Sequence, residues 1–181
     1  MVAFAAAEGV ELRLDGTQTQ VRRPRAHHAG RRAFVSGKRQ QNTIKVTTVC
    51  DRRGRTLWAG AVRPGRMHDQ TAIKTEGIEE LLWRYDAVHA TVDAGYQGLA
   101  KAFSGRVHAP PTKPAKNAPP EELEAWQPAR KQQSSQRICV EHANAEHKQW
   151  RALQRWIGRR EHYAETHLAI AGLVSDRAAR R

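Results

Sequence analysis

Two segments of this chain alternate apolar and polar residues and then stop at an aspartate. VELRL, residues 10–14, precedes Asp15, and VHATV, residues 88–92, precedes Asp93. An alternation with a period of two is typical of a strand that buries one face. Each aspartate has the opposite parity from the apolar residues, and a glycine within two positions lets the backbone turn away. The pattern therefore predicts two strands that end in carboxylates.

The rest of the chain predicts further elements around these two strands. We expect a hairpin of strands at 43–50 and 56–62, helices at 71–85 and 97–104, a short strand at 106–109, a short helix at 120–127, and helices at 136–150 and 161–178. A meander that passes into strand–helix alternation favours a mixed five-stranded sheet with flanking helices. This is the element order of a ribonuclease-H-like α/β fold. Residues 1–9 form only an Ala-rich lead-in, and 10–181 form a single domain.

The charge of the chain points to a polyanionic partner. The 181 residues carry a formal net charge of +13, with a pI near 10.7. Such a balance favours nucleic acid first and an anionic membrane surface second. No apolar run approaches the roughly 18 residues that a membrane span requires, so we expect no membrane partner. Cys50 and Cys139 have no metal-type spacing, which fits a reducing compartment without a disulfide framework. We therefore expect a cytoplasmic, nucleoid-associated protein.

The two aspartates have the placement of half a metal site. Ligands of open α/β sheets bind beyond the carboxyl ends of the strands, so Asp15 and Asp93 should share one site. A two-metal site needs a third carboxylate, and Glu141 is the candidate. On a helix, Ile138, Glu141, Ala145 and Lys148 form one stripe, which would turn both Glu141 and Lys148 toward the sheet edge. Three converging carboxylates repel one another, so the pKa of at least one should be raised.

Five motifs in order resemble those of the DDE-type transposases of bacterial insertion sequences, in the branch shared with Harbinger-like elements. They are DGTQ at 15–18, SGK at 36–38, PGRMHD at 64–69, DAGYQG at 93–98 and VEHA at 140–143. The resemblance implies a catalytic domain whose triad, here Asp15, Asp93 and Glu141, binds two Mg²⁺ or Mn²⁺ ions. It implies metal-dependent cleavage of double-stranded DNA at transposon terminal repeats and strand transfer into target DNA. Members of that family carry an N-terminal helix-turn-helix domain, which we expect to be absent here, and a homodimer is an assembly to expect.

Other residues are candidates for holding DNA or supporting the site. The expected phosphate contacts are Arg22, Arg23, Arg25, Arg31, Arg32, Lys38, Arg39 and Lys148. Three residues are accessory candidates. Asp69 is the expected N-cap of the helix at 71–85 and His68 braces its loop, with a fourth metal ligand as the alternative. Tyr96 is expected to pack behind the Asp93 turn rather than stack on a flipped base.

Two alternatives remain open at the level of sequence. The chain could be a catalytically inactive or domesticated remnant that acts as a basic DNA-binding protein. A zinc site at His142 and His147 is disfavoured, because their spacing of five puts them on different sides of a helix and no cysteine pair accompanies them. Trp150 and Trp156 fit helix-core positions better than base stacking.

Overall fold

The computed structural model describes residues 1–27 and 29–180, and it has a mixed sheet at its centre. The strand order is β3-β2-β1-β5-β6, with β4 added beside β2 and β7 beside β1. The strands are β1 Leu12–Val21, β2 Thr43–Cys50, β3 Thr56–Ala59, β4 Arg63–Pro64, β5 Ala90–Val92, β6 Val107–His108 and β7 Arg155–Trp156. The predicted α/β class with a mixed sheet and flanking helices is confirmed, and the sheet is consistent with a ribonuclease-H-like fold. Its five main strands are the predicted ones, whereas β4 and β7 are additional pairs of residues.

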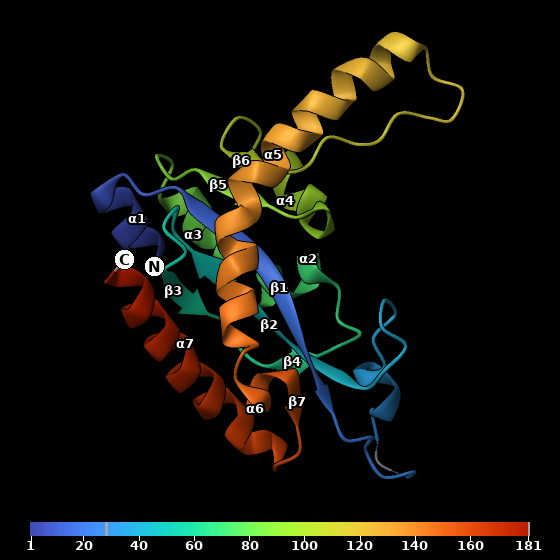
Figure 1. The fold of residues 1–181 in the computed structure, drawn as a ribbon, viewed down its shortest axis with the longest axis vertical. Helices are drawn as coiled ribbons and strands as arrows, with labels where there is room; N and C mark the ends of the chain where they lie inside the picture. Colours follow the sequence, from blue (N-terminus) through green and yellow to red (C-terminus); the bar gives the residue numbers. More distant parts are fainter. Residues whose placement is uncertain (28, 181) are drawn as a thin grey trace.

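Helices cover both faces of the sheet (Figure 1). The helices are α1 Val2–Glu8, α2 Asp69–Thr75, α3 Ile78–Arg84, α4 Gln97–Ala102, α5 Pro120–His147, α6 Arg151–Gln154 and α7 Tyr163–Ala179, with 3₁₀ turns at Arg31–Phe34, Ala94–Tyr96 and Arg160–His162. Helices α1 to α4 pack with Leu12, Leu14 and Val92 in the larger hydrophobic core. On the other face, α6 and α7 enclose a second core with Val21, Ile44 and Val46.

Strand β1 is longer than the sequence pattern indicates. We expected it to end at Leu14, but it continues to Val21. The reason is its antiparallel pairing with β2, which runs from Arg13 opposite Cys50 to Gln20 opposite Thr43. Asp15 therefore lies inside a strand, although it is the first residue beyond the short parallel pairing with β5. The expected hairpin of β2 and β3 is present, and Gly54 in its turn has a left-handed φ of 76°.

The helix expected over 71–85 is divided in two. Gly77 adopts a left-handed φ of 68°, which ends α2 and begins α3. Ile73, Ile78 and Leu82 are buried apolar residues that these two helices turn toward the core, while Leu81 is partly buried. The N-cap is His68 rather than Asp69, because the His68 Nδ1 accepts the backbone N–H of Gln70 and Asp69 is the first helical residue. The side chain of Asp69 is thereby free for a different role.

The two helices expected at 120–127 and 136–150 are one continuous helix, α5, of 28 residues. Pro128 lies inside it without ending it. Its ring removes one backbone hydrogen bond from a part of the helix that extends beyond the sheet, where water can satisfy the exposed carbonyl (Figure 1). The second half of α5 crosses the sheet over β1 and β2.

Both ends of the chain contain structure that the pattern did not indicate. Residues 1–9 are not merely a lead-in, because α1 places Val2 and Ala5 in the larger core. Near the other end, Trp156 lies on β7 and packs edge-on against Tyr163, while Trp150 precedes α6 and is 43 % exposed. Neither tryptophan occupies the predicted helix-core position. In the described residues, no helix combines the length and apolar character needed to cross a membrane.

Two buried histidines join α5 to α7. The His147 Nε2 lies 3.2 Å from the Thr56 hydroxyl of β3, and the rings of His147 and His167 meet edge-on. Burial lowers the pKa of His147 to about 4, against a small opposing effect of Glu146. Burial, and then the neighbouring His147, lower the pKa of His167 to about 4. The interface between the two helices therefore requires neutral imidazoles.

We predict that replacing His167 with Gln reduces the acid sensitivity of the fold. The unfolded chain protonates these imidazoles near pH 6.5, whereas the folded protein resists protonation until about pH 4. Their contribution to stability is therefore complete above pH 6.5 and is lost as the pH falls toward 4, on the order of 2–3 kcal/mol per group. Urea unfolding from pH 8 to 4 should show a flatter pH profile for His167→Gln than for the parent. The exposed His108→Gln should keep the parental profile, and an unchanged His167→Gln profile would contradict the assignment.

Candidate active site

Strand register brings Asp15 and Asp93 together. Leu14 of β1 pairs with Val92 of β5 in parallel, so the residues that follow them begin side by side. Helix α5 then crosses this edge and is fastened to it by side chains. The Gln133 amide donates to the Val92 carbonyl at 3.0 Å, and the Asn144 amide donates to Asp15 Oδ2 at 3.0 Å. These two contacts fix the stretch of α5 between them over both aspartates.

One guanidinium lies among all three predicted triad carboxylates. Arg137 Nη1 donates to Asp93 Oδ1 at 3.0 Å and lies 3.7 Å from Glu141 Oε1. Its Nη2 lies 3.7 Å from Asp15 Oδ1. Because the Asp93 and Glu141 oxygens lie 3.0 and 3.7 Å from the same nitrogen, they are at most 6.7 Å apart. The three acidic side chains therefore converge, and they do so around Arg137.

The sequence pattern did not indicate Arg137. The predicted stripe of α5 also differs from the helix face that contacts the site. The face that meets the site carries Arg137, Glu141, Asn144 and Lys148, at spacings of four, three and four. Ile138 and Ala145, which we expected on this face, instead line a hollow on the other side of the helix. An arginine one turn before Glu141 was the available signal, but in a chain of this charge a single arginine does not stand out.

Asp15 is the most buried of the three carboxylates, and its protonation reflects this. Burial raises its pKa to about 6, Arg137 opposes the shift, and the nearby charge of Asp93 adds to it. The backbone N–H of Gly16 and the Asn144 amide stabilise the ionised form. The expectation that one pKa would be raised is met at Asp15, although desolvation contributes more than repulsion between carboxylates.

Asp69 is close to the two aspartate turns but is held separately. Lys45 of β2 contacts Asp69 Oδ1 at 2.6 Å. A Cβ on Gly16 would lie 3.1 Å from that oxygen, and a Cβ on Gly95 would lie 2.5 Å from Oδ2. Residue 16 faces the same side of β1 as Leu14, because alternate residues of a strand share a face. Asp69 therefore lies on the face of β1 opposite to the Asp15 side chain. The glycines that follow the two predicted aspartates thus make room for a third acid, paired with its own lysine.

Tyr96 packs behind this arrangement, as predicted. Its ring is 1 % exposed and belongs to the larger core. Burial raises its pKa well above the ordinary value, and the charges of Asp69, then Asp15, add to the effect. Its hydroxyl has no hydrogen-bond partner among the described residues. Tyr96 is therefore an uncharged core group whose hydroxyl lies beside Gly16, on the face of β1 that also meets Asp69.

The donor set suits a hard divalent cation, but its present arrangement is centred on Arg137. Within residues 1–27 and 29–180, no three carboxylate, imidazole or thiol groups are placed so that they could hold a metal ion together. Three carboxylates are nevertheless the oxygen ligands that Mg²⁺ or Mn²⁺ prefers. The buried Oδ1 of Asn144, beside Asp15, has no hydrogen-bond partner in the described part of the chain. The chemistry of these residues therefore fits such an ion.

The predicted phosphate-binding residues occupy two regions. Arg22, Arg23, Arg25 and Arg32 are exposed and Arg31 is half-buried, in the segment between β1 and β2, within which position 28 lies outside the described residues. Lys38 and Arg39 follow in the same connection. Lys148 is the residue that ends α5, and its pKa is lowered by burial and by Arg39, against the attraction of Asp15. Lys148 thus lies near both Asp15 of the triad and Arg39.

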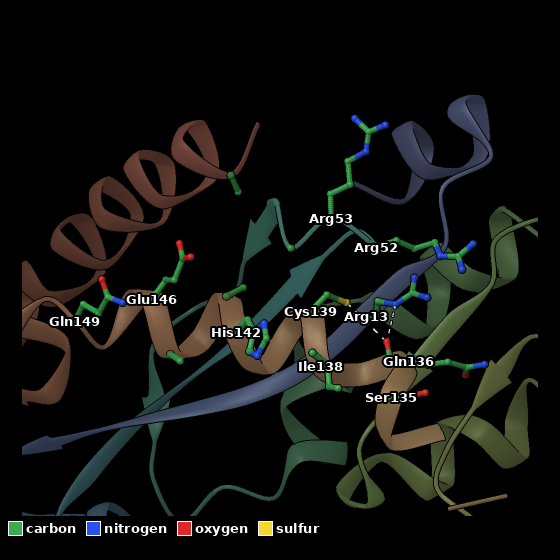
Figure 2. A pocket seen from close by; sticks show the side chains of 14 residues that line it. Arg13, Arg52, Arg53, Ser135, Gln136, Ile138, Cys139, His142, Glu146 and Gln149 are labelled. Carbon is green, nitrogen blue, oxygen red and sulfur yellow. Dashed lines mark hydrogen bonds between the residues drawn. The ribbon is translucent and has the colours of Figure 1, made fainter. Parts of the chain in front are cut away.

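A hollow lies along the side of α5 that carries Cys139 and His142 (Figure 2). It has a volume of about 740 Å³ and is lined by Arg52 and Arg53 of the β2–β3 turn, by Arg13 of β1, and by Cys139 and His142 of α5. The Cys139 thiol donates to the Gln136 carbonyl at 3.7 Å, and both Cys139 and the buried Cys50 of β2 are free cysteines. His142 faces this hollow while His147 is buried, so the two histidines share no site.

A comparison with known families identifies the class of this chain. Residues 14–174 match the family described as DDE superfamily endonuclease, so the chain belongs to that family. The match begins within β1, ends within α7, and includes the positions of Asp15, Asp93 and Glu141. No curated protein and no solved structure matches the chain.

We predict that Gly95→Ala destabilises the protein by about 1–3 kcal/mol, because its methyl group would overlap the Asp69 carboxylate that Lys45 holds in place. Gly37 has open space around it, so Gly37→Ala should change stability by less than about 0.5 kcal/mol. A double-mutant cycle tests this by comparing the free energies of unfolding of the parent, Gly95→Ala, Asp69→Ala and the variant that carries both substitutions. Full additivity in that cycle would show that Asp69 is not the group that requires the glycine.

Proposed function

We propose that this chain is the catalytic domain of a DDE transposase, which cleaves DNA at transposon ends and joins those ends to target DNA. The proposal is supported above all by one observation. Three carboxylates, from a strand, a strand end and a helix, converge on a single cation in a chain of the DDE superfamily endonuclease family. A nuclease of the transposase type follows from the family, whereas the reaction of this chain is our inference.

Asp15, Asp93 and Glu141 are the residues that would hold two Mg²⁺ or Mn²⁺ ions. Ions bound there would supply an activated water and would stabilise the leaving 3′ oxygen during an in-line displacement. Asn144 orients Asp15 through its 3.0 Å hydrogen bond, which keeps the most buried carboxylate turned toward the site. Lys148, near Asp15, is placed to hold a phosphate of the reacting strand. No side chain needs to form a covalent intermediate in this scheme.

The substrate we propose is double-stranded DNA: first the terminal repeats of a transposon, then a target site. The net charge of +13 suits this polyanion. The motifs favour the bacterial insertion-sequence branch related to Harbinger-like elements, and a homodimer would let two element ends be processed together. Localisation with the nucleoid follows from the same partner.

We predict that Asp93→Asn abolishes DNA cleavage in Mg²⁺ or Mn²⁺ while preserving the fold. The substitution is isosteric but removes the charge of a half-exposed ligand at the centre of the triad. Purified parent and variant should be compared on a labelled duplex that carries an element end, with thermal unfolding as the test of folding. The exposed Asp86→Asn is the matched control and should cleave like the parent.

Two results would alter the proposal. If Asp93→Asn cleaves as well as the parent, the activity does not reside in this site. If the parent binds element-end DNA but cleaves none of it, the alternative is favoured, in which the chain is a remnant that acts as a basic DNA-binding protein.

We also predict a division of labour between two groups of basic residues. Replacing Arg22, Arg23 and Arg25 together with Ala should flatten the salt dependence of DNA affinity by about three units, and should weaken binding to all sequences about equally. Lys148→Ala should change this slope by only about one unit and should lower the cleavage rate more than the affinity, because its charge acts where the transition state develops. Affinities measured by fluorescence anisotropy from 50 to 300 mM salt test this. An unchanged slope in the triple variant would show that these arginines do not contact DNA.

A further inference from the structure

Arg137 has a position that the proposed reaction does not explain. Its guanidinium lies among the three carboxylates that would hold the ions, although its side chain is only 10 % exposed. We propose that Arg137 is the resident counter-ion of the ion-free site, and that a divalent cation binds by displacing its guanidinium from among the three carboxylates. This inference rests on the proposed function, because it concerns the same three carboxylates.

The geometry shows that the guanidinium substitutes for an ion without fitting the site closely. Only the contact with Asp93, at 3.0 Å, is a hydrogen bond, whereas Asp15 and Glu141 are both 3.7 Å away. The Nε–H of Arg137 is buried and has no hydrogen-bond partner among the described residues. A permanent structural ion pair of an arginine would satisfy its fork of donors with paired, short contacts. The contacts of Arg137 are instead mainly electrostatic, and a small divalent cation can replace them.

Charge makes a resident cation necessary. Three carboxylates within a few ångströms repel one another unless a positive group lies between them. Of the other cations nearby, Lys45 is paired with Asp69 on the opposite face of β1, and Lys148 attracts Asp15 from the end of α5, where it lies beside Arg39. Arg137 is the cation that contacts all three acids of the triad. It therefore lets the ion-free chain fold with the carboxylates already gathered.

The exposure of the carboxylates indicates how an ion would enter. The side chains of Glu141 and Asp93 are 50 % and 39 % exposed, whereas that of Asp15 is 20 % exposed. A hydrated cation therefore meets Glu141 and Asp93 first, and these are the two acids that share Nη1 of Arg137. Binding of the cation to Glu141 and Asp93 would release Nη1 of Arg137. The carboxylate of Asp15 would then become accessible to the ion. Ion binding and movement of Arg137 are thus one event.

The decisive experiment measures Mn²⁺ binding without DNA, by isothermal titration at pH 8, in the parent and in Arg137→Met. Methionine keeps much of the length of the side chain and removes its charge. Arg137→Met should bind Mn²⁺ at least about ten-fold more tightly than the parent, because the ion no longer has a competitor. In the absence of metal the same variant should melt lower by about 4–10 °C, since the carboxylates have lost their counter-ion. Arg137→Lys should lie between the two in both measurements. Arg130→Met, on the exposed part of α5, should match the parent.

A second measurement follows Arg137 in the parent protein itself. The Arg137 Nε–H should give a protected side-chain signal in ¹⁵N spectra without metal, assigned by its loss in Arg137→Lys. Saturation with Mg²⁺ should shift this signal and remove its protection. A signal that is unchanged at saturating Mg²⁺ overturns the inference.

The outcomes separate this inference from the proposed function when Asp93→Asn is titrated as well. If Mn²⁺ binding is lost in Asp93→Asn but is equally tight in the parent and in Arg137→Met, the metal site stands and the displacement of Arg137 is wrong. If none of the proteins binds Mn²⁺ at this site, both are wrong. Tighter binding by Arg137→Met, abolished by adding Asp93→Asn, supports both.

Discussion

Carboxylates that are brought together repel one another, and much of this structure can be understood from how that repulsion is balanced. Asp15, Asp93 and Glu141 gather around Arg137, while Asp69 is held on the other face of β1 by Lys45. The triad and Asp69 thus have separate cations, and the buried Tyr96 nearby stays uncharged because its pKa is raised. The burial of Asp15 shows the remaining cost, because desolvation raises its pKa despite Arg137. A site of this kind is favourable to assemble only if the fold brings a cation to each group of acids, here from a neighbouring strand or helix.

The backbone supplies the other half of the arrangement. A short parallel pairing of β1 with β5 aligns the two aspartates, and the longer antiparallel pairing with β2 keeps β1 straight beyond them. Glycine is required at position 16 of β1 and at position 95 of the 3₁₀ turn after β5, because Asp69 fills the space that a side chain would take. Helix α5 completes the site since Gln133 and Asn144 fix it at two points that flank Arg137 and Glu141. The candidate site is therefore built from one edge of the sheet, two turns and half of one helix.

The rest of α5 and the basic segments extend from this centre without altering it. The N-terminal half of α5 projects from the domain, and the arginines between β1 and β2 lie at the other end of the molecule (Figure 1). The hollow lined by Arg13, Arg52 and Arg53 is bordered by the side of α5 that carries Cys139 and His142 (Figure 2). Positive charge is thus available on several sides of the domain, while the carboxylates are confined to one edge.

The sequence by itself determined the strand-and-helix order, the mixed sheet and the three acidic candidates. It could do so because alternation and turn residues are local properties, visible over five to ten positions. Local patterns could not show where β1 ends, because pairing with β2 extends it, nor that α5 is continuous through Pro128. They also could not identify Arg137, Lys45 or the role of Asp69, since these depend on which charges meet across 24 to 122 positions of chain. Only the tertiary structure decided that the three acids enclose an arginine, because the balance of buried charges is set by neighbours in space.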